Sequence, residues 1–242
     1  MAASIAALID LVCTRATTAP FLVGVAGPVA VGKTTIVRAL APGLTAAGRS
    51  VQVLSTDSFL LANDALNAQG LLMRKGFPES YDSAAMRAAL QRLRAGQAAA
   101  VPVYSHDVYD IVPNASEAIA AAAVILIEGI VALQPPAADA LDLAVYVDAE
   151  EEVVRGWFVA RFERLTAEAA AQPASFYHPF ASLPPEQVRQ IAVATWDTIN
   201  APNLHDHIAP SAARADVVVR KAADHSIAEL WTGTAAATGR AE

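Results

Sequence analysis

Short, mostly apolar segments alternate along this chain with segments of helical spacing. The strand-like segments have the composition of strands covered on both faces and lie at residues 21–26, 50–56, 124–127, 143–147 and 217–219. Helical spacing marks residues 2–18, 34–47, 83–95, 150–165 and 186–200. This alternation predicts an α/β fold with a mainly parallel sheet flanked by helices.

Cap and turn residues refine these boundaries. Ser83 is a suitable N-cap for the helix at 83–95, and Gly96 is expected to end it. The segment 58–82 has no clear periodicity and is expected to be irregular. The proline-bearing segment 171–185 is expected to be a loop.

Length and composition limit the class of protein. A chain of 242 residues can fold as one large α/β domain, so we expect one domain at residues 1–232 and a disordered tail at 233–242. Although 55% of the residues are hydrophobic, many of them are alanines. The longest apolar run, residues 118–127, is well short of the roughly 20 residues that cross a bilayer. The N-terminus does not have the pattern of a signal peptide, and we expect a cytoplasmic protein outside the membrane.

Charge and cysteine content exclude two further classes. The net charge is −7, and no stripe of Lys and Arg stands out, so nucleic acid is a poor candidate partner. Cys13 is the single cysteine of the sequence, which leaves no intrachain disulfide and no ligand set for structural zinc.

A phosphate-binding pattern follows the first predicted strand. Residues 27–34, GPVAVGKT, fit G-x-x-x-x-G-K-[ST] between an apolar strand and a helix, which is the context that the mechanism requires. Glycines let successive N–H groups turn toward phosphate oxygens, and a lysine adds mobile charge. The residues expected to bind the phosphates of ATP are Gly27, Val29, Ala30, Val31, Gly32, Lys33, Thr34 and Thr35.

Within this loop two threonines have different expected roles. Thr34 should offer its hydroxyl to a Mg²⁺ ion that bridges the β- and γ-phosphates. Thr35 is either a helix residue or a second phosphate donor. The pattern therefore predicts ATP and Mg²⁺ as cofactors of the site.

Two acidic residues follow predicted strands at the same edge of the sheet. Asp57 and Glu128 lie just beyond strand ends, where ligands bind in doubly wound sheets. A kinase needs an acid for the metal and an acid that accepts the proton of the substrate hydroxyl. We assign Asp57 as the general base and Glu128 to the metal; the opposite assignment, or a turn-capping role for either residue, stays open.

Longer blocks of sequence resemble one family. The blocks are AGPVAVGKTT (26–35), TDSFL (56–60), MRKGFPESYD (73–82), PVYSHDVYDIVP (102–113), LIEGIVALQ (126–134), YVDAEEEVVRGWFVARF (146–162), SFYHPFA (175–181) and TWDTINAPNL (195–204). In this order they resemble the bacterial type I pantothenate kinases, P-loop kinases related to uridine kinase and phosphoribulokinase. The resemblance covers roughly residues 20–230.

This resemblance implies a fold and a reaction. It implies a three-layer P-loop NTPase fold and transfer of the ATP γ-phosphate to the primary hydroxyl of pantothenate, the first step of coenzyme A biosynthesis. It also implies a homodimer. Carried over by position, it assigns catalytic roles to Lys33 and Asp57, and to Arg161 as the residue that stabilises the transferring phosphoryl group.

The acceptor pocket is assigned by the same resemblance. The residues expected to contact the substrate are Tyr104, His106, Phe158, Tyr177 and Asn203. Structural alternatives stay open: a solvated helix charge for Arg161, a structural histidine at 106 and a helix cap at Asn203.

Departures from the family pattern leave the acceptor open. Phe158 stands where the family usually has tyrosine, and Pro179 and Phe180 stand where it has asparagine and tyrosine. A pocket that loses hydroxyls loses hydrogen bonds to its substrate. A related kinase for a nucleoside or a sugar is one alternative, and a nucleotide-binding module without turnover is another. The presence of Lys33, Asp57, Glu128 and Arg161 together argues against the second.

Overall fold

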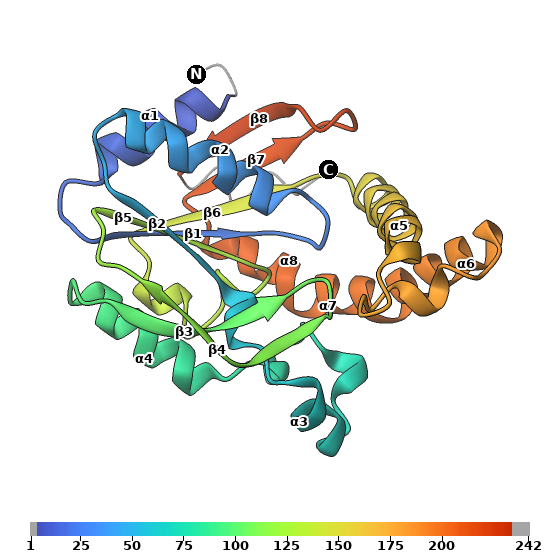
Figure 1. Ribbon diagram of the computed structural model, residues 1–242. Helices are drawn as coiled ribbons and strands as arrows, with labels where there is room; N and C mark the ends of the chain where they lie inside the picture. The colour runs from blue at the N-terminus through green and yellow to red at the C-terminus, as the bar shows by residue number, and fades with distance from the viewer. Residues whose placement is uncertain (1–3, 234–242) are drawn as a thin grey trace.

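The protein has three layers, with a mainly parallel sheet between two sets of helices (Figure 1). The computed structural model describes residues 4–233. Within these residues the sheet has six strands in the order β2-β5-β1-β6-β7-β8. They are β1 (Phe21–Ala26), β2 (Val51–Ser55), β5 (Val124–Glu128), β6 (Leu143–Asp148), β7 (Val217–Lys221) and β8 (Ile227–Thr232). Only β8 runs antiparallel to its neighbour among these described strands, so the predicted fold class is confirmed.

Helices cover both faces of this sheet (Figure 1). They are α1 (Ile5–Arg15), α2 (Lys33–Ala46), α3 (Asn63–Ala68), α4 (Ser83–Arg94), α5 (Glu151–Glu168), α6 (Pro185–Thr195), α7 (Ala201–Asn203) and α8 (Ala209–Ser211). The first two lie on one face, and α4 and α8 lie on the other. Between α6 and α8 the chain stays helical through π-type turns at 196–200 and 204–208.

Burial explains why the central strands were readable from sequence. Every residue of β1 and β6 is buried, as expected for parallel strands that carry helices on both faces. Strand β5 is buried up to Ile127, and its last residue, Glu128, is half-buried. The apolar run therefore ends where the sheet opens toward a site.

Several local predictions need correction. Asp82, not Ser83, caps α4: the Asp82 carboxylate accepts a hydrogen bond of 2.8 Å from the amide of Ala85, and Ser83 is the first helical residue. The segment 58–82 is not wholly irregular, because it contains α3, two short 3₁₀ turns and the end of a third that begins at Thr56. The predicted tail at 233–242 lies outside the described residues except for Gly233.

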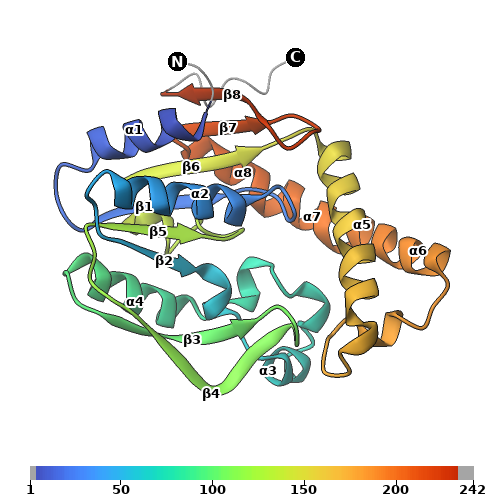
Figure 2. The same cartoon turned by 45° about the horizontal axis from the view of Figure 1, so that its top comes forward.

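A separate two-stranded hairpin was not predicted. It consists of β3 (Ala99–Ser105) and β4 (Asp110–Ile119), paired antiparallel. Pro102 and Pro113 interrupt the strand pattern, and much of β4 is exposed, so its side chains do not show apolar alternation. Together with α3, this hairpin flanks one side of the carboxyl edge of the sheet (Figure 2).

The other side of that edge is flanked by α5 and α6 (Figure 2). These two helices pack on each other through a small apolar cluster separate from the main core, formed by Val159, Phe162, Val188 and Ala192. The carboxyl ends of the strands therefore lie between the hairpin with α3 on one side and α5 with α6 on the other (Figure 2). Among residues 4–233, no helix combines the length and apolar character needed to cross a bilayer.

Gly129 provides a test of how the strand end is built. Its φ is +152°, and an added Cβ would overlap the Thr56 hydroxyl. Gly129→Ala should lower the free energy of unfolding by about 1–3 kcal/mol, because both the backbone and the contact become strained. Urea denaturation followed by circular dichroism measures the change.

The matched control is Gly156→Ala in the exposed part of α5, where an added Cβ meets nothing within 4 Å. This variant should be more stable than the parent by roughly 0.5–1 kcal/mol, since alanine is favoured over glycine in a helix. Equal stability of the two variants would contradict this account of Gly129.

Candidate active site

The phosphate-binding loop connects β1 to α2 through strained backbone. Gly27, Ala30 and Gly32 have φ values of +147°, +66° and +96°. A Cβ on Gly27 would overlap the carbonyl oxygen of Val147 in β6, so only glycine fits there. Val29 lies half-buried in the turn. This curvature turns successive amides toward one point, the arrangement that binds anions.

The loop opens directly into the N-terminus of α2. Gly32 is the N-cap and has no side chain with which to cap the helix, so the first amides remain for a ligand. Thr34 and Thr35 lie exposed on the first turn, and Val31 is buried beneath it. The sequence-predicted phosphate site is thus one continuous surface.

Lys33 lies at the centre of the charged groups. Its ammonium donates to the carbonyl oxygens of Gly27 at 3.0 Å and Pro28 at 2.8 Å. Burial lowers the pKa of Lys33 to about 8, opposed by the negative charges of Glu128 and Asp57 and assisted by the positive charge of Arg161. The structure therefore brings together the four charged residues that the sequence had selected.

The pairing register explains why the acids converge here. Glu128 is the register partner of Val25 in β1 and of Ser55 in β2, so it lies between the phosphate-binding loop and Asp57. Parallel strands end at one edge, and three neighbouring strands each deliver one element of the site.

Glu128 and Thr34 form an oxygen-rich pair. The Thr34 hydroxyl donates to Glu128 Oε1 at 3.2 Å. Burial raises the pKa of Glu128, while Lys33, the Thr34 hydrogen bond and His106 oppose the rise. Mg²⁺ prefers oxygen ligands and is commonly held by one or two protein groups plus phosphates and water, which this pair could supply. Within residues 4–233 no cluster of three or more His, Cys, Asp or Glu residues forms a metal site of its own.

Asp57 lies at the carboxyl edge of the sheet, beyond β2. It sits on the 3₁₀ turn Thr56–Phe59 directly after β2, where its amide donates to Ser55 Oγ at 3.2 Å. Its side chain is half-buried, and its charge acts on Lys33, Glu128 and Lys75. A carboxylate in this place can take a proton from a hydroxyl presented to the phosphate site.

The β3–β4 hairpin contributes an aromatic wall. The ring of Tyr104 meets His106 edge-on at 5.1 Å and Tyr109 at 6.3 Å between centroids. Burial raises the pKa of Tyr109 to about 12 and raises that of Tyr104 further, and the Asp57 charge adds to both shifts. Both phenols therefore stay protonated and can donate hydrogen bonds, while His106 is exposed at the rim.

Helix α5 and the loop after it form the opposite wall. The Phe158 ring packs against Trp196 at 5.8 Å, and the Tyr177 ring meets Phe162 edge-on at 5.3 Å. Burial raises the pKa of the Tyr177 phenol. Arg161 is exposed on α5, with its charge acting on Lys33, Tyr109 and Tyr177.

The two walls touch at their tips. The amide of Phe176 donates to the carbonyl oxygen of Asp107 at 2.7 Å, and the Phe176 ring stacks on Tyr109 at 4.6 Å. Neither contact was expected from the sequence, because the two segments are about seventy residues apart. The other arginines of α5 are used elsewhere, Arg155 with Asp197 and Arg164 with Glu168.

Asn203 is buried beside the hairpin side of the site. Its Nδ2 donates to the carbonyl oxygen of Gly76 at 2.9 Å, so the side chain does not cap a helix. Its Oδ1 accepts no hydrogen bond from the part of the chain that the structure describes. A buried acceptor left without a partner costs free energy, so the fold holds this carboxamide in place against that cost.

Sequence reasoning missed three residues of this region. Lys221, at the end of β7, is buried with its ammonium 3.0 Å from the Val31 carbonyl oxygen and 4.9 Å from the centre of the Trp157 ring. Its signal was the basic pair at 220–221 that follows the apolar run at 217–219. Lys75 and Tyr109 lie inside blocks that carried the family resemblance, but only the structure shows that the Lys75 ammonium donates to the Tyr109 carbonyl oxygen.

Comparison with known proteins agrees with this geometry. The sequence model of the phosphoribulokinase / uridine kinase family matches residues 22–164. A pantothenate kinase of Streptococcus pneumoniae (serotype 19F, strain G54) is 40% identical over 220 residues, which cover 88% of this chain and 72% of that protein. A pantothenate kinase of Lactococcus lactis subsp. cremoris (strain MG1363) is 38% identical over 222 residues, with the same coverage.

Solved structures support the fold. A putative fructose transport system kinase from Silicibacter sp. TM1040 superimposes with a TM-score of 0.67 at 22% identity, covering 84% of this chain and 92% of that one. D-glycerate 3-kinase from Cryptococcus neoformans superimposes with a TM-score of 0.66 at 13% identity, covering 95% and 99%. At these identities the likeness extends to the fold alone.

Lys221 generates a prediction about the phosphate-binding loop. Lys221→Met removes the donor that holds the Val31 carbonyl and should weaken ATP binding roughly tenfold or more, the usual effect of losing a charged hydrogen bond. Isothermal titration calorimetry measures the dissociation constant. Arg38→Met, on an exposed position of α2, is the control and should bind ATP as the parent does. A folded Lys221→Met protein with unchanged affinity would rule out this role.

Proposed function

This chain belongs to the phosphoribulokinase / uridine kinase family of P-loop kinases, and we propose that it is an ATP-dependent pantothenate kinase. It is a phosphotransferase that acts on an alcohol. The observation that carries the proposal is the convergence of Lys33, at the start of α2, with Glu128 and Asp57 at the carboxyl edge of three adjacent strands. The curated relatives of about 40% identity support the acceptor.

In this proposal the phosphate-binding loop holds the donor. The amides at the start of α2 and the ammonium of Lys33 contact the phosphates of ATP. Thr34 and Glu128 would hold Mg²⁺, which supplies positive charge that offsets the charge on the phosphates. Lys33 would exchange its present carbonyl partners for phosphate oxygens, a stronger attraction for an ammonium.

The acceptor side supplies the proton transfer. Asp57 accepts the proton of the primary hydroxyl as the hydroxyl oxygen attacks the γ-phosphorus. The bond from the γ-phosphorus to the bridging oxygen breaks, and ADP leaves with the electron pair. Arg161, whose charge already acts at Lys33, neutralises charge on the transferring group.

The two walls would orient pantothenate. Tyr104 and Tyr177 donate hydrogen bonds from phenols kept protonated by burial, and His106 adds a polar contact at the rim. Asn203 would contact the substrate through its carboxamide, which requires the buried Oδ1 to become accessible when the substrate binds. Phe158 contributes apolar surface. The cytoplasmic location, the homodimer and the single kinase domain at 1–232 stay predictions.

Substrate identity is tested by an acceptor screen. Purified protein with Mg-ATP should release ADP with pantothenate and show at least tenfold lower kcat/KM with nucleosides and sugars, because the relatives that support the acceptor are pantothenate kinases. A coupled ADP assay measures each rate. A higher kcat/KM with a nucleoside or a sugar would show that this compound, and not pantothenate, is the acceptor. ATP binding without turnover on any compound would contradict the assignment as an enzyme.

The role of Asp57 is tested by Asp57→Asn. The amide keeps the shape of the side chain but cannot take the proton, so kcat should fall by about 10²–10⁴ while ATP affinity stays within a factor of three. Steady-state kinetics and calorimetry give the two values. Asp64→Asn, an exposed acid of α3, is the control and should keep full kcat. An unchanged kcat in Asp57→Asn would refute the base assignment and favour Glu128.

A further inference from the structure

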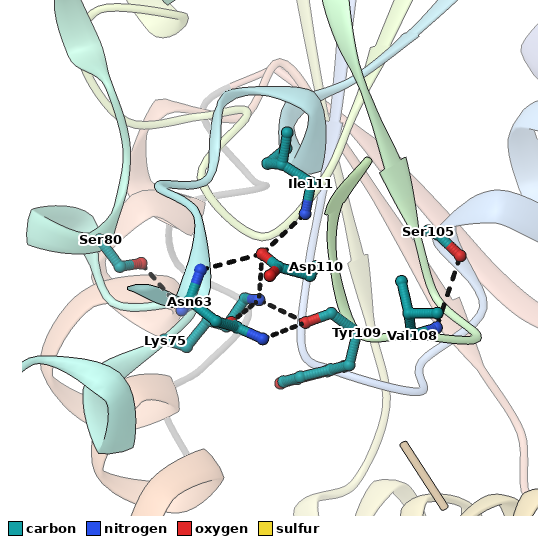
Figure 3. Close-up of polar contacts among 9 residues, drawn as sticks. Asn63, Lys75, Ser80, Ser105, Val108, Tyr109, Asp110 and Ile111 are labelled. Carbon is teal, nitrogen blue, oxygen red and sulfur yellow. Dashed lines mark hydrogen bonds and ion pairs between the residues drawn. The ribbon is translucent and has the colours of Figure 1, made fainter. Parts of the chain in front are cut away.

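Lys75 is a buried cation on the acceptor side of the site. Its side chain is 4% exposed, and its ammonium donates to Asn63 Oδ1 and to the carbonyl oxygen of Tyr109, each at 2.6 Å (Figure 3). The carboxylate of Asp110 lies 3.9 Å away. Lysines are seldom buried to this degree unless every donor has a partner, so this position is specified by its neighbours.

Those partners hold a strained turn in the hairpin. Tyr109 has φ +56°, a left-handed conformation that is unfavourable for a residue with a bulky side chain. Its carbonyl oxygen accepts from both Lys75 and the Asn63 amide group, the latter at 3.1 Å. Asp110 Oδ1 accepts from the backbone amides of Asn63 and Ile111 at 2.9 and 2.8 Å. Such strain persists where surrounding contacts fix it, and it is frequent at functional sites.

The next two residues contact a different part of the molecule. The Gly76 carbonyl oxygen accepts from Asn203 Nδ2, and the Phe77 ring meets His207 edge-on at 5.7 Å. Residues 75–77 therefore join the hairpin on one side to the helical segment that follows α6 on the other. Three consecutive residues thus contact two segments that are far apart in sequence.

We propose that Lys75 is a positioning residue of the acceptor site, which holds the hairpin wall that carries Tyr104 and Tyr109 against the helical segment after α6 that carries Asn203. The ammonium also lies 5.2 Å and 4.6 Å from the ring centres of Tyr104 and Tyr109, so it fixes the rings as well as the backbone. The role in acceptor binding rests on the proposed function. The junction between the hairpin and the segment after α6, called the lock below, rests only on the contacts of residues 63, 75, 76, 109 and 203.

Lys75→Met tests the lock because it removes the charge and keeps the stem. Asp110 keeps its two backbone donors in this variant, so no carboxylate is left without a partner. The KM for the acceptor found in the screen should rise about tenfold to a hundredfold, since misplacement by an ångström is enough for such losses. The KM for ATP and the turnover per folded molecule should stay within a factor of three. Loss of stability alone would instead lower the active fraction and leave both KM values unchanged.

Arg87→Met is the control. Arg87 is a cation at an exposed position of α4, and its loss should change neither KM. Asn63→Leu keeps Lys75 and removes a partner, so it provides a second route if Lys75→Met does not fold. In a double-mutant cycle the effects of the two substitutions on KM for the acceptor should be non-additive. The double variant should have a KM no higher than that of the more impaired single variant. Additive effects would show that Lys75 acts elsewhere.

Amide hydrogen exchange separates this inference from the proposed function. In Lys75→Met, the amides of residues 104–111 should exchange at least tenfold faster, while those of the phosphate-binding loop at 27–35 should not change. This result would support the lock even if the screen found no acceptor. Unchanged exchange at 104–111 in folded Lys75→Met would overturn the proposal whatever the enzyme phosphorylates.

Discussion

The parallel register of three strands is the constraint on which the site depends. Glu128 in β5 lies opposite Val25 in β1 and Ser55 in β2, and each partner strand continues directly into functional backbone. A shift of β5 by one residue would turn the Glu128 side chain to the other face of the sheet. The burial of β1 and β5 on both faces therefore fixes the position of Glu128 in the site as well as the packing of the core.

This register gathers opposite charges in a confined space. Lys33 faces two carboxylates, Glu128 and Asp57, and one guanidinium, Arg161. Burial disfavours every charge in such a place, and mutual attraction offsets that cost only when the groups stay close. The four side chains therefore stabilise one another as long as the strands keep them close.

The sequence predicted the central strands because each is a continuous apolar run, and it predicted the phosphate-binding loop because glycine and lysine spacing is specific. The acceptor side was harder to predict. Strand β4 is exposed and interrupted by Pro113, and the cap of α4 moved from Ser83 to Asp82 because a carboxylate was available one position earlier. Lys75 and Lys221 act through carbonyl oxygens, and no side-chain pattern marks a carbonyl that will accept a hydrogen bond.

The contact between the wall tips has a consequence for how such enzymes diverge. One of the two contacts there joins the backbone amide of Phe176 to the backbone carbonyl of Asp107, so this part of the closure does not depend on which side chains the two positions carry. Substitutions at lining residues such as Phe158 would therefore leave this backbone contact in place. A scaffold closed in this way allows descendants to acquire new substrates through drift in a few lining positions, with the phosphate-transfer apparatus inherited intact.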